Sequence, residues 1–396
     1  MTDQNLVLKF NLAHFNHHLA TGALIPLLPL LRQSFGLNYF ESGVLAAAFS
    51  LSLGFGQIPM AMLADRFSRR LVIVVGMLGV GAASIGVSLT STFWQMVPWV
   101  VVMGLFAATY HAPASSFLSQ AFPPDRRGKV LGLHVIGGSA ALIVVPILAL
   151  WLATLFGSWR AAFFLLAWPA LLTCPLLWLG TQELVGDATH HSGSAKRKTG
   201  EGQENDTSSG SWLSILRAIG LLIFFAMVMQ LVVSSVNSYL PLFVVDQHGV
   251  SPRLGGLVTS LTAGASILGA PLGGALSDRL GRKSVILVAI SLSGPLLLAV
   301  TKAPYGIPLL LALGCYGIVM VARLPLAESL IADHVPVRRR ATVLAIYLFV
   351  GQETGGLVTP LLGGFVDAHG FDAVLTTISV ALCGIGALAW LLRKHM

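Results

Sequence analysis

The chain has 396 residues, of which 55% are hydrophobic and only 10% are charged. Soluble globular proteins carry about 25% charged residues, so most of this surface is expected to face lipid rather than water. The composition therefore excludes a soluble enzyme, a disordered protein and a secreted disulfide scaffold. The formal charge of +8 is compatible with several kinds of partner, and the positions of the basic residues decide between them.

Apolar segments follow one another along the whole chain. A helix needs about 20 mainly apolar residues to cross the hydrocarbon core of a membrane. We predict an all-α membrane protein with twelve transmembrane helices, at residues 6–31, 41–64, 71–90, 94–120, 129–153, 160–180, 213–244, 253–277, 284–301, 305–332, 341–365 and 372–392.

One polar segment interrupts this pattern. Residues 181–212 are rich in Gly, Ser and charges of both signs, a composition that cannot bury a core and is typical of a flexible linker. The chain is therefore predicted to consist of an N-terminal half at residues 1–180, the linker at 181–212 and a C-terminal half at residues 213–396.

The basic residues are distributed unevenly between the two sides of the predicted membrane. Eighteen of the 24 Lys and Arg residues fall on the side of the termini and the linker, whereas four fall on the other side: Arg32, Arg160, Arg253 and Lys302. Because cytoplasmic loops carry an excess of Lys and Arg, we expect both termini in the cytoplasm and the chain in a bacterial inner (plasma) membrane. This distribution explains the basic charge without a nucleic-acid partner, which we do not expect.

An internal repeat links the two halves. Residues 63–75 (LADRFSRRLVIVV) align with residues 276–288 (LSDRLGRKSVILV) at an offset of 213, and the same offset aligns residues 127–131 with residues 340–344. The chain is therefore predicted to contain two six-helix halves. Parallel repeats of this kind are the architecture of transporters whose halves rock about a central site.

Each copy of the repeat carries the pattern Asp-Arg-x-x-Arg between two spans. An Asp at a helix end can meet the positive N-terminus of a facing helix, and the basic residues can pair with acids on neighbouring helix ends, such as Glu328 and Asp333. Contacts of this kind can form in one state and break in another, so we interpret the loops as a cytoplasmic gate. The alternative is that the charges only cap helices and set topology. The residues assigned to the gate are Asp65, Arg66, Arg69, Asp278, Arg279, Arg282 and Glu328.

The second copy of this loop, Gly274-Ala-Leu-Ser-Asp278-Arg279-Leu-Gly281-Arg282-Lys283, closely resembles the signature loop of the major facilitator superfamily. The first copy departs from the family pattern, because Ala61 and Ser68 stand where the family usually has glycine. The resemblance implies the major facilitator fold, with twelve helices in two pseudo-symmetric halves.

Within the superfamily, the chain resembles the branch of the fosmidomycin-resistance-type exporters. The residues that carry this second resemblance are His14 and Pro29 in the first span, Tyr110-His111-Ala-Pro113 in the fourth, and Leu133-His134-Val-Ile-Gly137-Gly138 in the fifth. It implies proton-driven export of small amphiphilic compounds.

Several histidines lie inside the predicted spans, where an ionisable side chain costs about 2.5–3.5 kcal/mol at the bilayer centre. His14 and His18 share one face of the first span, whereas His17 points elsewhere; His111 and His134 lie in the fourth and fifth spans. Imidazole can relay protons or bind a polar substrate, and we assign these roles to His14, His18 and His111. The alternatives are hydrogen bonds that only pack helices and, for the His14–His18 spacing, a metal site. Without an Asp or Cys cluster nearby we expect no metal.

The C-terminal half contributes Arg323 in the tenth span and Glu353 in the eleventh, two helices that contribute to the central cavity in superfamily members. The offset of 213 places Arg323 opposite Tyr110, beside His111. Arg can hold an anionic group through two hydrogen bonds, and a buried Glu can carry a proton. A static Arg323–Glu353 ion pair is the alternative. The remaining residues assigned to the substrate or proton pathway are Tyr110, Gln57 and Asn237.

These features predict a secondary transporter that moves a small amphiphilic or anionic solute by alternating access, with proton-coupled export as the leading mechanism. We expect a monomer with no cofactor, whose partners are the small-molecule substrate, protons and the lipid bilayer. Uptake or facilitated transport of a metabolite or lipid-like molecule stays open, because the same cavity serves both directions. A transporter-like membrane sensor is the alternative from another class. We expect no enzyme activity, since no nucleophile–base motif stands out.

Overall fold

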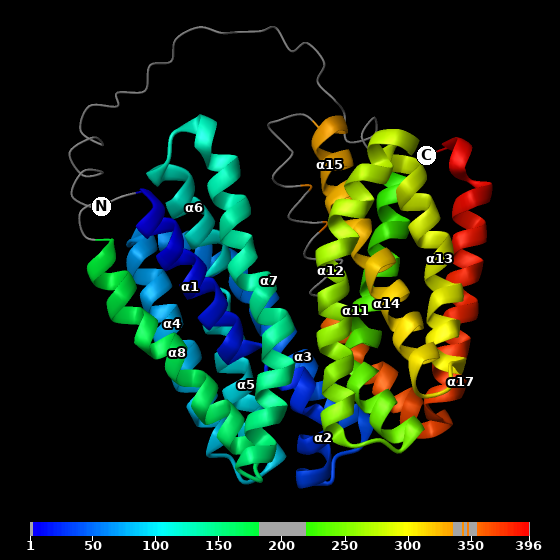
Figure 1. Cartoon of the computed structure of the whole chain (residues 1–396), viewed down its shortest axis with the longest axis horizontal. Helices are drawn as coiled ribbons and strands as arrows, with labels where there is room; N and C mark the ends of the chain where they lie inside the picture. The colour runs from blue at the N-terminus through cyan, green and yellow to red at the C-terminus, as the bar shows by residue number, and fades with distance from the viewer. Residues whose placement is uncertain (1–2, 182–218, 336–342, 344–346, 348–354, 396) are drawn as a thin grey trace, which may run out of the picture.

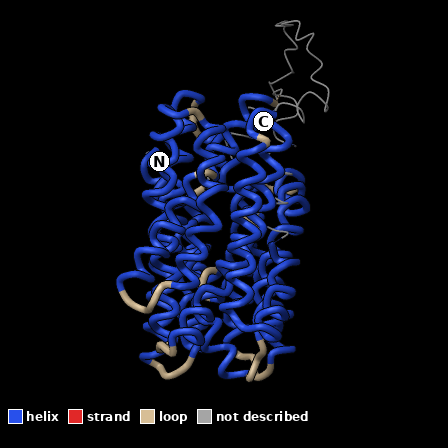
Figure 2. Tube along the Cα trace, turned by 90° about the vertical axis from the view of Figure 1, so that its right-hand side faces the viewer, coloured by secondary structure: helices blue, strands red, loops and turns tan. Residues whose placement is uncertain are grey.

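The computed structural model describes residues 3–181, 219–335, 343, 347 and 355–395, and within these ranges the chain forms helices and short connections. The helices run roughly from top to bottom in both views (Figures 1 and 2). In chain order the elements are α1 (Asp3–Thr21), α2 (Leu24–Phe35), α3 (Tyr39–Arg66), α4 (Arg69–Ser88), α5 (Phe93–Ala107), α6 (His111–Ala121), α7 (Pro124–Leu155), α8 (Trp159–Gly180), α11 (Leu221–His248), α12 (Pro252–Leu280), α13 (Arg282–Lys302), α14 (Ile307–Ala322), α15 (Leu324–His334), α17 (Gly355–Leu391) and the short 3₁₀ helix η3 (Arg393–His395).

The helices form two bundles that stand side by side. The first bundle contains α1 to α8 and the second contains α11 to α17 (Figure 1). Two pairs of helices make the main contacts between the bundles, because α3 packs against α17 and α7 packs against α12. This arrangement agrees with the two predicted halves, whose boundaries at residues 180 and 213 stay a prediction.

The number of continuous helices differs from the twelve that the sequence predicts. Within the described residues, ten helices are long and apolar enough to cross a membrane. The predicted span at 6–31 is divided into α1, which carries Asp3, Lys9 and three histidines, and α2, which has only 12 residues. The last two predicted spans meet in α17, whose 37 residues run across a kink at Gly370 with φ 78°. Twelve crossings result when α1 and α2 count as one crossing and α17 counts as two.

The internal repeat is also present in the packing of the two bundles. A Cβ atom on Gly56 in α3 would lie 2.9 Å from the Cβ atom of Ala108. The equivalent Gly269 in α12 meets Val321, where a Cβ atom would lie 3.2 Å from the Cβ atom of that valine. Both members of the second pair follow the first by the offset of 213. The same helices therefore approach each other closely, at equivalent points, in both bundles.

Three helices are broken near the middle of the molecule, and each break lies just before a proline. Pro26, Pro113 and Pro325 lie in the first turns of α2, α6 and α15. Proline has no backbone N–H and its ring clashes with the carbonyl four residues earlier, which favours a break, although Pro59 and Pro146 lie inside the continuous helices α3 and α7. Broken helices expose backbone and polar side chains inside a membrane protein, which is where transporter sites form.

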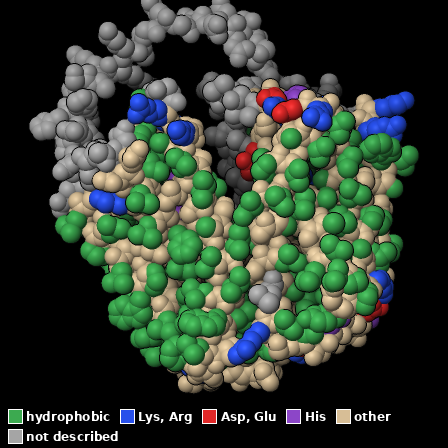
Figure 3. All heavy atoms as spheres, viewed as in Figure 1, with side chains coloured by type: hydrophobic (Ala, Val, Ile, Leu, Met, Phe, Trp, Pro, Cys, Tyr) green, Lys and Arg blue, Asp and Glu red, His purple; other side chains and the backbone are tan. Residues whose placement is uncertain are grey.

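The two ends of the molecule are different. Arg32, Arg160, Arg253 and Lys302 lie at helix ends on the side of Gly370 and of the 303–306 connection, which we call the closed end. The chain termini lie at the opposite end, which we call the open end (Figure 1). At the open end a hollow separates the two bundles in the space-filling view (Figure 3). The structure therefore separates the basic residues as the sequence predicts; which end faces the cytoplasm stays a prediction.

Candidate functional site

A cavity of about 510 Å³ lies between the two bundles. Its wall is largely apolar, with Leu24, Phe49 and Leu142 from the first bundle and Met320 from the second. A mainly apolar wall with a few convergent polar groups is typical of small-molecule sites. The polar side chains on the wall are His17, His18, Thr21, His111, Asn237, Ser238, Thr262 and Tyr316.

A compact group of five histidines and one tyrosine lies at and behind the first-bundle side of this cavity. We call it the histidine cluster, and its members are His14, His17 and His18 of α1, Tyr110 and His111 at the break before α6, and His134 of α7. The His14 ring stacks on the ring of His134, with 4.4 Å between the centroids. The break in the helix formed by α5 and α6 is what brings Tyr110 and His111 against α1.

Hydrogen bonds hold two members of the cluster in place. The Nδ1 atom of His14 lies 2.9 Å from the carbonyl oxygen of His134. The hydroxyl of Tyr110 donates to the carbonyl oxygen of Phe10 over 2.9 Å. Within the described residues, the Nδ1 atoms of His17 and His134 are buried without a hydrogen-bond partner. The cluster thus combines fixed rings with unused polar atoms, a combination suited to ligand binding or proton transfer.

Arg323 lies at the equivalent break in the second bundle, between α14 and α15, and is fully buried. It donates a hydrogen bond from Nη2 to the side-chain oxygen of Gln230 in α11. Its Nε and Nη1 atoms have no hydrogen-bond partner among the described residues. The phenol groups of Tyr316 and Tyr347 are its electrostatic neighbours, and Tyr316 lies on the cavity wall. A buried guanidinium with unused donors is costly unless something anionic completes it.

The predicted site residues are therefore divided by the structure. His18, His111 and Asn237 lie on the cavity wall, whereas His14 and Tyr110 lie behind it in the histidine cluster. Gln57 is exposed on α3 and is not on the wall. Glu353 lies outside the described residues, so its predicted pairing with Arg323 stays a prediction.

The predicted gate loops lie at the open end. Arg282 forms an ion pair with Asp333, one of the two acids that the sequence places near it; the pair joins α13 and α15 within one bundle. In the first loop, Nη1 of Arg69 donates to Gln120 over 2.8 Å, and Arg66 lies over the ring of Phe67 at 5.9 Å. The role of these contacts in gating stays a prediction.

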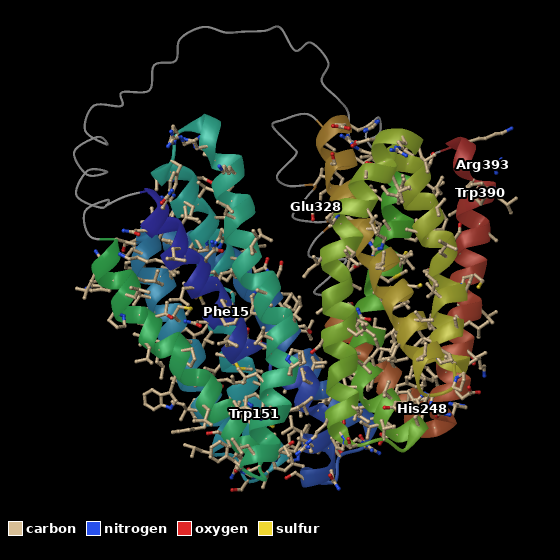
Figure 4. The ribbon with its side chains drawn as sticks, viewed as in Figure 1. Phe15, Trp151, His248, Glu328, Trp390 and Arg393 are labelled. Carbon is tan, nitrogen blue, oxygen red and sulfur yellow. The ribbon has the colours of Figure 1, made fainter. Side chains whose placement is uncertain are left out.

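For the other gate residues, no contact with the opposite bundle is described. Asp278 and Arg279 are exposed at the end of α12, and Asp65, whose backbone ends α3, has no described side chain. Glu328 is half-buried on the side of α15 that faces the first bundle (Figure 4).

The closed end carries a polar network that sequence reasoning missed. Asp367 of α17 accepts hydrogen bonds from the backbone N–H groups of Tyr39 and Phe40 over 2.8 and 2.9 Å, and so caps the N-terminus of α3 from the other bundle. Asp246 of α11 accepts from the Arg32 guanidinium over 2.9 Å and from the Tyr39 hydroxyl over 2.8 Å. We call these four contacts the closed-end latch.

A carboxylate at a helix N-terminus, as in this latch, is the type of contact that the sequence predicts for Asp65 or Asp278. The structure shows it at the opposite end of the molecule. The available signal was an acid in the connection between the last two predicted spans, and that signal does not reveal which helix the acid faces.

Comparison with known proteins identifies the family. The chain matches the Major Facilitator Superfamily over residues 10–255 and 222–395. It belongs to that superfamily. It is therefore an integral multi-pass membrane transporter and not an enzyme.

Among similar proteins, a multidrug resistance protein, MdtG, from Proteus mirabilis is 25% identical over 360 residues, which cover 89% of this chain and 86% of that protein. An uncharacterised MFS-type transporter of Bacillus subtilis, YfnC, is 22% identical and covers 93% of this chain and 88% of its own length. The particular resemblance to the fosmidomycin-resistance-type branch stays a prediction.

Solved structures show the same fold at low sequence identity. A D-xylose–proton symporter superposes with a TM-score of 0.77 and 17% identity, covering 99% of this chain and 97% of that one. A POT family transporter in complex with a thioalcohol-conjugated peptide reaches a TM-score of 0.80 at 12% identity, covering 99% and 96%. The predicted all-α major facilitator fold is thus confirmed.

Proposed function

We propose that this secondary transporter exports small amphiphilic anions by alternating access, in exchange for protons. The observation that carries the proposal is Arg323, a fully buried guanidinium next to an apolar cavity, whose Nε and Nη1 atoms have no hydrogen-bond partner among the described residues. An anionic group of the cargo would satisfy these donors through a bidentate contact. The apolar wall would hold the rest of the cargo, which makes an amphiphilic molecule the best fit.

The arrangement of the two ends supports alternating access. The cavity is built from both bundles, so a change in the angle between the bundles would change its access without dismantling either wall. The closed-end latch would have to break as the opposite end closes. We propose that the open end is cytoplasmic, on the basis of the 18 basic residues at the termini, the linker and the open-end loops.

Proton coupling would use Glu353. Arg323 and Glu353 lie on neighbouring spans in the predicted topology, and a carboxyl in the membrane interior stays neutral unless a cation or water stabilises its charge. Glu353 would take up a proton when the cavity opens outward and release it when the cavity opens inward, so that the proton and the anionic cargo bound at Arg323 cross in opposite directions. The names of the MdtG relatives favour export over uptake, and uptake by the same cavity remains the competing direction.

The decisive experiment is transport by the purified protein in proteoliposomes under an imposed pH gradient, with amphiphilic anions as candidate cargo. We expect the wild-type rate to follow the gradient. Glu353→Gln is expected to abolish accumulation driven by the gradient while exchange of cargo for cargo continues, because a neutral amide cannot carry the proton.

Glu328→Gln is a matched control, since Glu328 is a second acid in the same bundle that is assigned to the gate and not to coupling. A wild-type rate that ignores the gradient would refute the coupling. Full gradient dependence in the Glu353→Gln variant would return Glu353 to a structural role.

A further inference from the structure

Three members of the histidine cluster converge on one point. The side-chain nitrogen atoms that His14, His18 and His111 can each offer to a ligand all lie within 4.8 Å of one another. Their ring centroids form a nearly regular triangle, with sides of 5.0 Å for His14–His18, 5.3 Å for His14–His111 and 5.3 Å for His18–His111. These residues come from two helices that are distant in sequence, so the triangle depends on the break before α6.

The hydrogen bond of His14 fixes the chemical form of its ring. A carbonyl oxygen only accepts, so the Nδ1 atom of His14 must carry the proton in its bond to the carbonyl of His134. The Nε2 atom of a neutral His14 ring then has a free lone pair. Histidines that bind metals are held in this way, with one nitrogen on the ion and the other donating to a carbonyl or carboxylate oxygen.

The dimensions of the triangle fit a metal ion. With Zn–N bonds of about 2.0–2.1 Å and tetrahedral angles, three bound imidazole rings have centroids roughly 5.2 Å apart. The observed sides of 5.0–5.3 Å match this spacing, and rotation of the rings would bring their nitrogen atoms, now within 4.8 Å of one another, onto one ion. His17 has similar centroid distances to His18 and His111, but it does not share in the convergence of ligand atoms and stacks on Tyr110 instead.

We propose that His14, His18 and His111 bind a divalent transition-metal ion of the Zn²⁺ type, with the fourth coordination position open to the cavity. His18 and His111 lie on the cavity wall, while His14 lies behind them. Three neutral imidazoles plus one exchangeable ligand is the pattern of an open, reactive metal site rather than a closed structural one.

The inference deepens the proposed function, on which it rests for the identity of the fourth ligand. Three neutral ligands leave the +2 charge of the ion uncompensated, and the described residues of the cluster include no acid. An anionic donor atom of the cargo would supply the missing negative charge. The cargo class is then an anion with a donor atom that coordinates metals, held between the ion on one wall and Arg323 behind the other.

The test measures metal binding by the purified full-length protein in detergent, without an affinity tag of histidines and after removal of metals with a chelator. The paired linker residues His190 and His191 are first replaced by alanine, since they could bind Zn²⁺ themselves. Zn²⁺ is titrated against a competing dye, and Co²⁺ serves as a spectroscopic probe of coordination. We expect one Zn²⁺ per chain and a Co²⁺ spectrum typical of four-coordinate geometry.

Substitutions separate the three ligands from the rest of the cluster. His14→Gln, His18→Gln and His111→Gln are each expected to weaken Zn²⁺ binding more than about 100-fold, beyond the roughly 10- to 100-fold loss caused by removing second-shell support. His17→Gln is the matched control, because His17 lies in the same cluster and on the same wall, and it should bind Zn²⁺ within about threefold of the parent. Thermal unfolding without metal verifies that each variant is folded.

Two results would overturn the metal site: no saturable Zn²⁺ binding by the parent protein, or equal weakening in the His17→Gln and His111→Gln variants. The pH-gradient experiment, repeated in chelated buffer, separates this inference from the proposed function. Gradient-driven transport without Zn²⁺ binding would remove the metal site and leave the exporter. Zn²⁺ binding by His14, His18 and His111 together with transport that ignores the gradient would keep the metal site and refute the proton coupling.

Discussion

Tyr110 and Arg323 occupy equivalent positions in the two bundles, 213 residues apart, and each precedes the second part of a broken helix. Both are almost fully buried, with 1% and 0% of their surface exposed. Tyr110 has one hydroxyl donor, which is used on the carbonyl of Phe10. Arg323 has five N–H donors; among the described residues it donates to Gln230 and lies beside the phenol of Tyr347, while its Nε and Nη1 atoms have no hydrogen-bond partner.

The same backbone feature, a broken helix, therefore carries different side-chain chemistry in the two bundles. In the first bundle the break holds neutral aromatic rings, which can exchange protons or bind a metal ion. In the second bundle it holds a fixed positive charge, because Arg does not deprotonate in proteins. Under the proposed function, a cavity between two such walls would have one side that exchanges protons or binds a metal ion and another that binds the anionic cargo.

The largest expected effect on cargo binding appears when loss of the charge at one break is compared with loss of the hydroxyl at the other. Arg323→Ala should weaken binding of an anionic cargo by roughly 10- to 100-fold, since a hydrogen bond to a charged group contributes about 1.5–3 kcal/mol. Tyr110→Phe should lower stability by about 1 kcal/mol and change affinity little, because its hydroxyl bonds to the backbone. Ligand-dependent thermal shifts with an anionic compound and its neutral analogue measure both.

Arg323→Lys sharpens this test, because lysine keeps the charge and loses the planar pair of donors. It should fall between wild type and Arg323→Ala. Equal losses for the anionic compound and the neutral analogue in Arg323→Ala would mean that the guanidinium only supports packing, and the contrast between the two breaks would then have no role in binding.

The sequence predicts the equivalence of Tyr110 and Arg323 better than it predicts the hydrogen-bond partners of these two residues. The repeat offset alone aligns Tyr110 with Arg323, and the prolines after both positions explain why the helices break there. By contrast, the Arg323–Gln230 contact depends on the rotation of α11 about its axis, which hydropathy does not encode. Gln57 illustrates the same limit, because a residue in the right helix can still face away from the cavity.

Contacts between the bundles are harder still to predict. The closed-end latch joins residues more than 200 positions apart. A pattern in one segment indicates a helix end and its charge, but the facing helix is known only once the fold and the conformational state are known. The predicted gate gives Asp65 and Asp278 a contact between a carboxylate and a helix N-terminus. The structure shows a contact of this type at the closed end.

The latch gives the second prediction, which compares the two ends of the molecule. Asp367→Asn keeps the size of the side chain and removes the charge that caps two N–H groups of α3. Asn keeps one acceptor oxygen and loses the other, and the lost charge-assisted hydrogen bond contributes about 1–2 kcal/mol, so the equilibrium between arrangements should shift roughly 5- to 30-fold toward opening of this end. Distances between spin labels on the two bundles at the closed end would report the shift.

Asp372→Asn is the matched control for the latch. Asp372 forms an ion pair with Lys302 over 2.6 Å at the same end, but both residues belong to the second bundle. Its loss should leave the distances between bundles unchanged. If both variants shift these distances equally, general loss of surface charge is responsible and the cap on α3 is not a latch.

The last comparison concerns the two gate loops, which make equivalent turns with different residues. Gly281 has φ 82° and ψ 145°, a conformation that L side chains rarely adopt, whereas Ser68 has φ −169° and caps α4 through its side chain. Gly281→Ala should therefore lower the free energy of unfolding by about 1–3 kcal/mol through backbone strain. Ser68→Ala should cost about 1 kcal/mol through loss of the cap, and Ser68→Gly only a few tenths.

Chemical unfolding in detergent measures these differences in free energy. A further variant at the same position, Gly281→Ser, identifies their cause. Gly281→Ser should be as unfavourable as Gly281→Ala, because a cap at this position cannot relieve a positive φ. If Gly281→Ser is instead as stable as wild type, the second loop can adopt the extended conformation of the first, and glycine is not required there by its backbone. The glycine of the family signature would then serve transport rather than folding, and the same variant would slow transport without lowering stability.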